Sequence, residues 1–126
     1  MSSVTTDKAR DLFADAHYQG VAVPQVVEMG WGDGGVDGGG NVITPSGSLT
    51  TVPGEFIRTA FTGVVKDGLT VTFTSEIIYT DPDALGKDLS SCGIYDDLGN
   101  LIAVKNFKAK NIDDETRIEV DWRELF

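Results

Sequence analysis

Near the start of the chain, apolar residues recur at the spacing of a helix. Residues 5–18 are predicted to be helical, with Thr5 or Thr6 as the capping residue and Gly20 as the residue that ends the helix. Asp7 falls in the first turn, where the helix dipole favours an acidic side chain. The apolar face consists of Ala9, Leu12, Phe13 and Ala16. We expect this face to cover a sheet.

Further along, apolar and polar residues alternate, which is typical of strands with one buried face. Residues 69–79 and 116–122 alternate most clearly, and 21–29 is a further strand that Pro24 places at an edge or a bulge. Lys66-Asp67-Gly68 predicts a tight turn that pairs residues 56–66 with 69–79. The expected core face consists of Leu69, Val71, Phe73, Ile77 and Tyr79, with Ile94, Ile102 or Leu101, Ile118 and Val120.

A second hairpin is predicted between residues 92 and 104. Its strands are Cys92–Tyr95 and Leu101–Val104, and its turn contains Asp96, Asp97, Gly99 and Asn100. Together these elements predict an α+β fold, in which a short N-terminal helix packs on a mainly antiparallel sheet or a small β-sandwich. The 126 residues form a single domain, and 40% of them are hydrophobic.

Glycine dominates the stretch after the first predicted strand. Seven of the eleven residues from Gly30 to Gly40 are glycine, and no clear element follows until Pro53. A free glycine-rich loop has high conformational entropy. Loops as long as residues 30–53 are usually functional or disordered, so we expect this loop to be mobile until a partner orders it.

Charge narrows the choice of partners. The formal net charge is −10, which disfavours a nucleic-acid backbone as the main partner. Lys105, Lys108 and Lys110 lie along a predicted edge strand, where lysines prevent edge-to-edge pairing. No apolar run approaches the roughly 20 residues of a membrane-spanning helix, and no secretory signal is visible. The lone Cys92 excludes an internal disulfide.

Residues suited to catalysis are scarce, so the sequence predicts a protein that is not an enzyme. The single His17 falls on the helix, and Cys92 begins an apolar strand, where a thiol usually packs as a small hydrophobe. The paired carboxylates lie in turns, where aspartate bonds to backbone amides. Asp33, Asp37 and Asn41 lack the spacing of an EF-hand loop, so we predict no metal and no cofactor.

Two motifs resemble the N-terminal domain of phage tail-collar fibre proteins. The first is Met29-Gly30-Trp31-Gly32-Asp33-Gly34-Gly35, and the second is the hairpin from Gly93 to Val104. The resemblance covers roughly residues 4–122. It implies a structural virion protein that attaches a tail fibre to the baseplate of a contractile tail, or forms the root of that fibre. It also implies assembly in the host cytoplasm, with baseplate or tail-fibre proteins as partners and a homotrimer as the oligomer.

The family continues into a shaft and a receptor-binding tip, whereas this sequence ends at Phe126. A fibre root, an adaptor and a baseplate subunit therefore all stay open. Trp31 either packs onto the core or plugs a partner's pocket. The residues expected to dock a partner are Trp31, Gly32, Asp33, Gly34, Gly35, Asp96, Asp97, Trp122 and Phe126. The alternative is a small acidic β-rich module that recognises a carbohydrate or a protein outside a virion.

Overall fold

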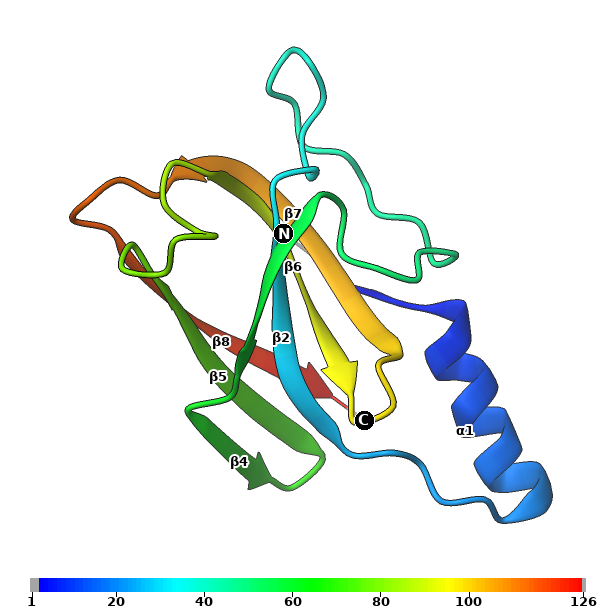
Figure 1. The fold of residues 1–126 in the computed structure, drawn as a ribbon. Coiled ribbons are helices and arrows are strands. Elements are labelled where there is room, and N and C mark those ends of the chain that lie inside the picture. The colour runs from blue at the N-terminus through cyan, green and yellow to red at the C-terminus, as the bar shows by residue number, and fades with distance from the viewer. Residues whose placement is uncertain (1–2, 126) are drawn as a thin grey trace.

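A computed structural model describes residues 3–125 as one short helix and two antiparallel sheets, so the predicted α+β class is confirmed (Figure 1). The large sheet has the strand order β1-β7-β6-β2-β3, and the small sheet has the order β4-β5-β8. The elements in chain order are β1 (Val4–Thr5), α1 (Asp7–Gln19), β2 (Val26–Gly32), β3 (Glu55–Ala60), β4 (Gly63–Asp67), β5 (Thr70–Ile78), β6 (Asp88–Asp96), β7 (Leu101–Asn111) and β8 (Arg117–Leu125).

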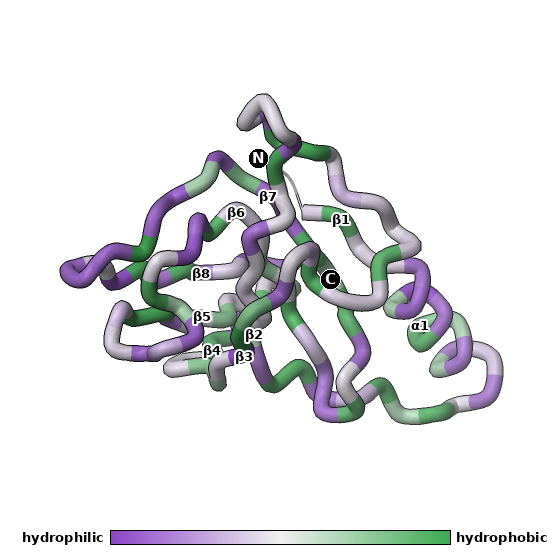
Figure 2. Tube along the Cα trace, turned by 45° about the horizontal axis from the view of Figure 1, so that its top comes forward, coloured by the Kyte–Doolittle hydropathy of each residue, from purple (hydrophilic) through white to green (hydrophobic). Residues whose placement is uncertain are grey.

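The helix α1 forms where its end signals predict it. Thr6 is the N-cap, and its Oγ1 accepts a hydrogen bond from the Ala9 N–H at 3.1 Å. Gly20 adopts φ = 69°, and its N–H bonds to the Ala16 carbonyl. Thr6 Oγ1 also donates to the Leu101 carbonyl at 2.5 Å, which ties the start of α1 to β7. Hydrophobic and hydrophilic residues alternate along α1 (Figure 2). The helix lies at the opposite end of the molecule from the turn between β7 and β8 (Figures 1 and 2).

The chain passes from the large sheet to the small sheet between β3 and β4. The predicted hairpin is confirmed for β4 and β5, with Gly68 at φ = 60° in the turn. Residues 55–60, however, pair with β2 in the large sheet, so the prediction that all of 56–66 pairs with β5 is wrong. At the crossing, Ser75 Oγ donates to the Ala60 carbonyl at 2.9 Å and shares a 2.7 Å hydrogen bond with Thr59 Oγ1.

The main core lies between the two sheets. Phe73, Ile77, Ile94 and Ile102 are buried there as predicted, and Val71, Ile118 and Val120 pack against them partly buried. Leu69 and Tyr79 are exceptions, at 70% and 37% exposed, so their assignment to the core is wrong. Leu69 falls in the turn before β5 and Tyr79 follows its last residue, so neither lies on the part of the strand that faces the large sheet.

The other face of the large sheet carries a second, smaller core. Its buried residues are Val52, Tyr95, Leu101 and Val104, with Leu49 packed against them. Val52 and Leu49 belong to the segment 33–54, which connects β2 to β3 and which we call the strap. The strap rises above the sheet and folds back over it (Figure 1). A sheet covered on both faces explains why β6 is buried along nearly its whole length.

Candidate functional site

The glycine motif is part of the framework of the fold. β2 runs on through Gly32, and the following residues pack against the far end of the strap. A Cβ on Gly32 would lie 2.1 Å from the Pro53 carbonyl oxygen, and one on Gly35 would lie 2.0 Å from the Ser90 carbonyl oxygen. The Gly35 N–H donates to Ser90 Oγ at 2.8 Å. Gly32 and Gly35 are therefore buried contacts within the chain, and the prediction that they dock a partner is wrong.

Trp31 packs into the core, which was one of the two alternatives for it. Its side chain is fully buried between the sheets, and its Nε1 donates to Thr59 Oγ1 at 2.8 Å. The glycines around it suggest an exposed loop, but Trp31 lies on β2, an interior strand of the large sheet, where it pairs with Cys92 of β6 and Ile57 of β3. Its assignment to a docking surface is therefore wrong.

The C-terminal strand gives a similar result. Trp122 is 1% exposed, and its Nε1 donates to Glu124 Oε2 at 2.9 Å. The Lys105 ammonium lies 4.5 Å from the centre of its ring. Trp122 thus belongs to the core, and its assignment to a docking surface is wrong because β8 turns this side chain toward the large sheet. Phe126 lies outside the described residues.

In the hairpin turn between β6 and β7, the two aspartates have different surroundings. Asp96 is 1% exposed, and its carboxylate accepts hydrogen bonds from the Leu98 N–H at 3.0 Å and the Asn100 N–H at 2.8 Å. Asp96 therefore holds the turn and is not available to a partner, which corrects its predicted role. Asp97 is exposed, and its N–H donates to the Gln25 carbonyl.

The outward part of the strap is its tip at residues 37–43. Asp37 Oδ1 accepts from the Gly39 and Asn41 N–H groups, and the Asn41 and Gly39 amides hold the pKa of this carboxyl below its usual value. Val42 and Ile43 are 48% and 43% exposed. At the base of the strap, Asp33 is exposed and Gly34 is half-buried. Within residues 3–125, no three His, Cys, Asp or Glu side chains are grouped as metal ligands.

A polar cluster on the outer face of the large sheet has no counterpart in the sequence predictions. The Tyr95 hydroxyl donates to Glu55 and accepts the Val52 N–H at 2.9 Å. Arg58 bonds to Glu55 at 2.6 Å and places its guanidinium 3.7 Å over the Tyr95 ring. Burial, with the hydrogen bond to Glu55, raises the pKa of Tyr95. These residues clip the end of the strap to the sheet, and no local spacing reveals them because they lie on three separate segments.

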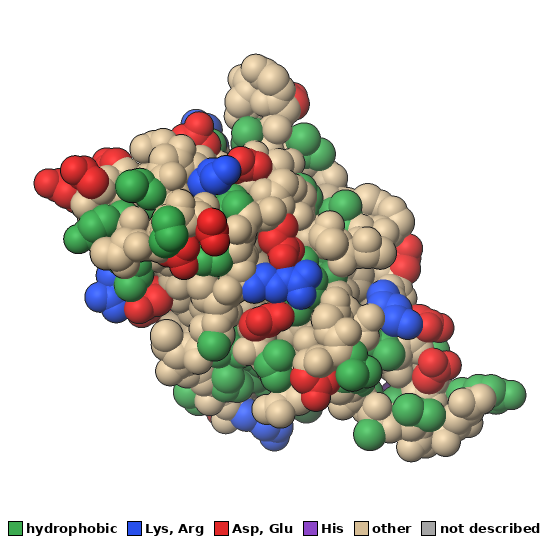
Figure 3. All heavy atoms as spheres, viewed as in Figure 1, with side chains coloured by type: hydrophobic (Ala, Val, Ile, Leu, Met, Phe, Trp, Pro, Cys, Tyr) green, Lys and Arg blue, Asp and Glu red, His purple; other side chains and the backbone are tan. Residues whose placement is uncertain are grey.

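Charged side chains of both signs share this face of the molecule, and acidic groups gather at the end where β7 turns into β8 (Figure 3). Arg58 also lies 3.5 Å from Glu28, so one basic group serves two carboxylates. The cluster is thus internally paired.

The two residues best suited to nucleophilic chemistry are in different environments. Cys92 is fully buried between the sheets, and this burial raises the pKa of its thiol to about 12 despite the opposing charge of Lys105. His17 is exposed in the last turn of α1. A protonated thiol in the core and an imidazole in solvent do not make an activated pair.

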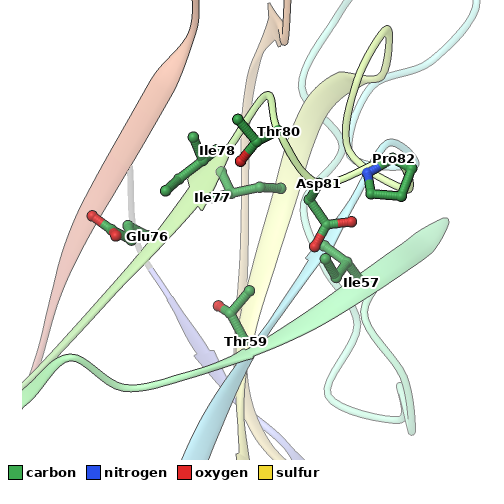
Figure 4. A pocket seen from close by; sticks show the side chains of 8 residues that line it. All are labelled: Ile57, Thr59, Glu76, Ile77, Ile78, Thr80, Asp81 and Pro82. Carbon is green, nitrogen blue, oxygen red and sulfur yellow. The ribbon is translucent and has the colours of Figure 1, made fainter.

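A cavity of about 420 Å³ lies between β3 and the end of β5 (Figure 4). Its carboxylates are Glu76 and Asp81, which lie at opposite sides with Ile77 between them. Glu76 is ion-paired with Arg117, and Asp81 accepts the Asp83 N–H at 3.0 Å. Both carboxylates therefore serve the fold, and they do not form the close pair that acid–base catalysis uses.

No family model, curated protein or solved structure matches this chain. The resemblance to tail-collar fibre proteins therefore stays a prediction from its motifs. No helix in the described part of the chain is long and apolar enough to cross a membrane.

Proposed function

We propose that this chain is a non-enzymatic assembly protein of a contractile phage tail, which attaches a tail fibre at the baseplate or forms the root of that fibre. The role follows from the two motifs that resemble tail-collar fibre proteins. Of the residues predicted to dock a partner, Asp33 and Asp97 are exposed and Gly34 is half-buried. The strap tip at residues 37–43, which belongs to the loop expected to be ordered by a partner, is exposed as well.

One observation carries this proposal: the two motifs, some sixty residues apart in the sequence, meet on neighbouring strands. Gly30 pairs directly with Gly93, and Gly32 pairs with Ser91. A Cβ on Gly93 would lie 2.8 Å from the Ala103 carbonyl oxygen and 2.9 Å from Val52. The motifs therefore form one packed unit that supports the strap, which is consistent with a shared domain rather than two chance matches.

The chemistry of the described residues also favours assembly over turnover. The thiol is buried and protonated, the histidine is exposed and apart from it, and the acidic side chains of the turns cap backbone amides. An exposed Trp31 would have served a binding module and a tail-docking surface alike, and this ring is buried. The two motifs are therefore what favours tail assembly over the binding module.

Native mass spectrometry of the chain, alone and mixed with the products of neighbouring genes, tests the proposal. We expect a defined complex with a baseplate or fibre protein. Val42→Asp at the strap tip should weaken that complex at least tenfold, whereas Val64→Asp on β4 should leave it unchanged. The two valines are matched, at 48% and 54% exposed. A chain that stays monomeric with every neighbour, or two variants with equal effects, would contradict the proposal.

A further inference from the structure

Two strand edges without a neighbour face each other across one side of the molecule. Beyond Val104, β7 pairs only with β6, and β8 pairs only with β5, as far as residues 3–125 show. We call the groove between them the β7–β8 seam. Besides Ser3 and Asp121, its walls include Lys105, Phe107, Lys110, Ile118, Val120, Trp122 and Arg123. Edge strands present N–H and C=O groups that a further strand can bind.

The floor of the seam is apolar in its smaller hollow and mainly polar in its larger one. A hollow of about 120 Å³ lies between β7 and β8, and Phe107, Ile118 and Val120 contribute its apolar lining. A second hollow of about 360 Å³ adjoins it at Lys105 and reaches Trp122 and Arg123. Ile118 and Val120 are only partly buried, so the core is incompletely covered here. Side chains of an added strand would complete that cover.

The rim of the seam is basic, in a protein whose formal net charge is −10. Lys105, Lys110 and Arg123 line the two hollows, and none of them forms an ion pair within the described part of the chain. The acidic residue that lines the same hollows is Asp121, which accepts a 2.7 Å hydrogen bond from Thr74. The seam therefore presents positive charge without an ion-pair partner around a floor that is apolar in its smaller hollow.

We propose that the β7–β8 seam binds an extended acidic segment of a partner protein as an added strand. Its backbone pairs with a free edge, its alternate apolar side chains enter the hollows, and its carboxylates pair with Lys105, Lys110 and Arg123. This inference deepens the proposed function. It rests on that function in one respect, since only the proposed function identifies the source of the segment as a neighbouring tail protein. The chemistry of the segment follows from the seam alone.

A peptide fits the seam better than a nucleic acid does. Phosphate groups would meet the same lysines, but the overall negative charge repels a long polyanion. A nucleic acid also leaves the strand edges without backbone partners. The unpaired edges and the apolar floor are the features that select a protein strand.

The direct test uses a synthetic peptide of about nine residues, the length of a strand, in which valine alternates with glutamate. A matched peptide carries lysine in place of glutamate. Binding is measured by fluorescence anisotropy, and amide hydrogen exchange locates the site. We expect the glutamate peptide alone to bind and to slow exchange along residues 105–111 or 118–124.

Variants of the chain test which basic residues bind the carboxylates of the peptide. Lys105→Glu with Lys110→Glu should weaken glutamate-peptide binding at least tenfold, and Lys8→Glu with Lys66→Glu, which changes the net charge equally, should not. Because Lys105 lies over Trp122, Lys110→Glu alone provides a variant with an intact core, and it should weaken binding at least threefold.

Equal binding of both peptides, no loss in the seam variants, or lysine-dependent binding of a DNA oligonucleotide in place of the peptide would overturn the inference. Failure of these peptide tests would refute this inference and leave the proposed function standing, because the proposed function is tested separately with Val42→Asp at the strap tip.

Discussion

Phe73 offers the sharpest test of how the two sheets pack. The ring is 5% exposed, faces Trp122 across the β5–β8 pair, and lies 5.0 Å from the Phe61 ring centre. A phenyl side chain buries roughly 150–200 Å², which at about 25 cal/mol per Å² is worth roughly 4–5 kcal/mol. Alanine keeps part of that area but leaves a cavity, so Phe73→Ala should lower the free energy of unfolding by about 3–5 kcal/mol.

Leu69→Ala is the matched control for Phe73→Ala. The sequence pattern places both residues on one face of a strand, but Leu69 is 70% exposed. Removing its side chain should cost less than about 0.5 kcal/mol. Urea unfolding followed by tryptophan fluorescence measures both values, because Trp31 and Trp122 are buried in the same core. A loss below about 1 kcal/mol for Phe73→Ala, or equal losses for the two variants, would refute this account of the core.

Two further predictions concern the strap and the thiol. Gly35→Ala places a Cβ 2.0 Å from the Ser90 carbonyl oxygen and should cost about 1–3 kcal/mol in urea unfolding, whereas Gly38→Ala has open space around it and should stay within about 0.5 kcal/mol. Hydrogen exchange should be slow at the Gly35 amide, which donates to Ser90; fast exchange there would contradict a packed motif. Cys92 should resist a thiol reagent at pH 8 until the chain unfolds. Its folded pKa of about 12 exceeds the value of 9.0 expected for an exposed thiol, so the unfolded chain loses its proton first and stability should fall as the pH rises above about 9.

The parts of the fold that follow from the sequence are those with local causes. Thr6 and Gly20 mark the ends of α1 because a side-chain oxygen and a positive φ satisfy the helix termini within a few residues. Gly68 and Gly99 likewise adopt positive φ in the two hairpin turns. Each of these signals acts over one turn of chain, so the sequence alone is enough to place it.

The division of strands between the sheets has no such local signal. Residues 55–67 show no clean alternation of apolar and polar residues, so their pattern does not indicate which sheet they join. The crossing between β3 and β4 depends on Thr59 and Ser75, which meet from different strands. The position of Trp31 also depends on distant segments. Glycines flank Trp31 and suggest a loop, but a Cβ on Gly32 would lie 2.1 Å from the Pro53 carbonyl oxygen and one on Gly30 would lie 2.6 Å from the Tyr95 ring, so close neighbours of the strand require both glycines.

One part of the candidate site follows from the sequence and another part does not. The resemblance identified the glycine motif and the hairpin, and these lie on the paired strands β2 and β6 of the large sheet. The polar cluster of Glu28, Glu55, Arg58 and Tyr95 and the basic rim of the seam depend on which strands become neighbours. Such contacts between distant segments are invisible until the topology is known.

The pairing of Gly32 with Glu55 has a consequence for how this domain can vary. Because β2 and β3 are antiparallel neighbours, the strap is topologically an insertion in a hairpin whose ends are already held together. The entropic cost of closing a loop rises only slowly with its length. The strap tip can thus lengthen, shorten or change its sequence while the sheet keeps its register, so descendants of one scaffold can acquire new binding specificities at this tip. For the same reason, the open positions around Gly38 are a natural place to insert a fluorescent label or an epitope.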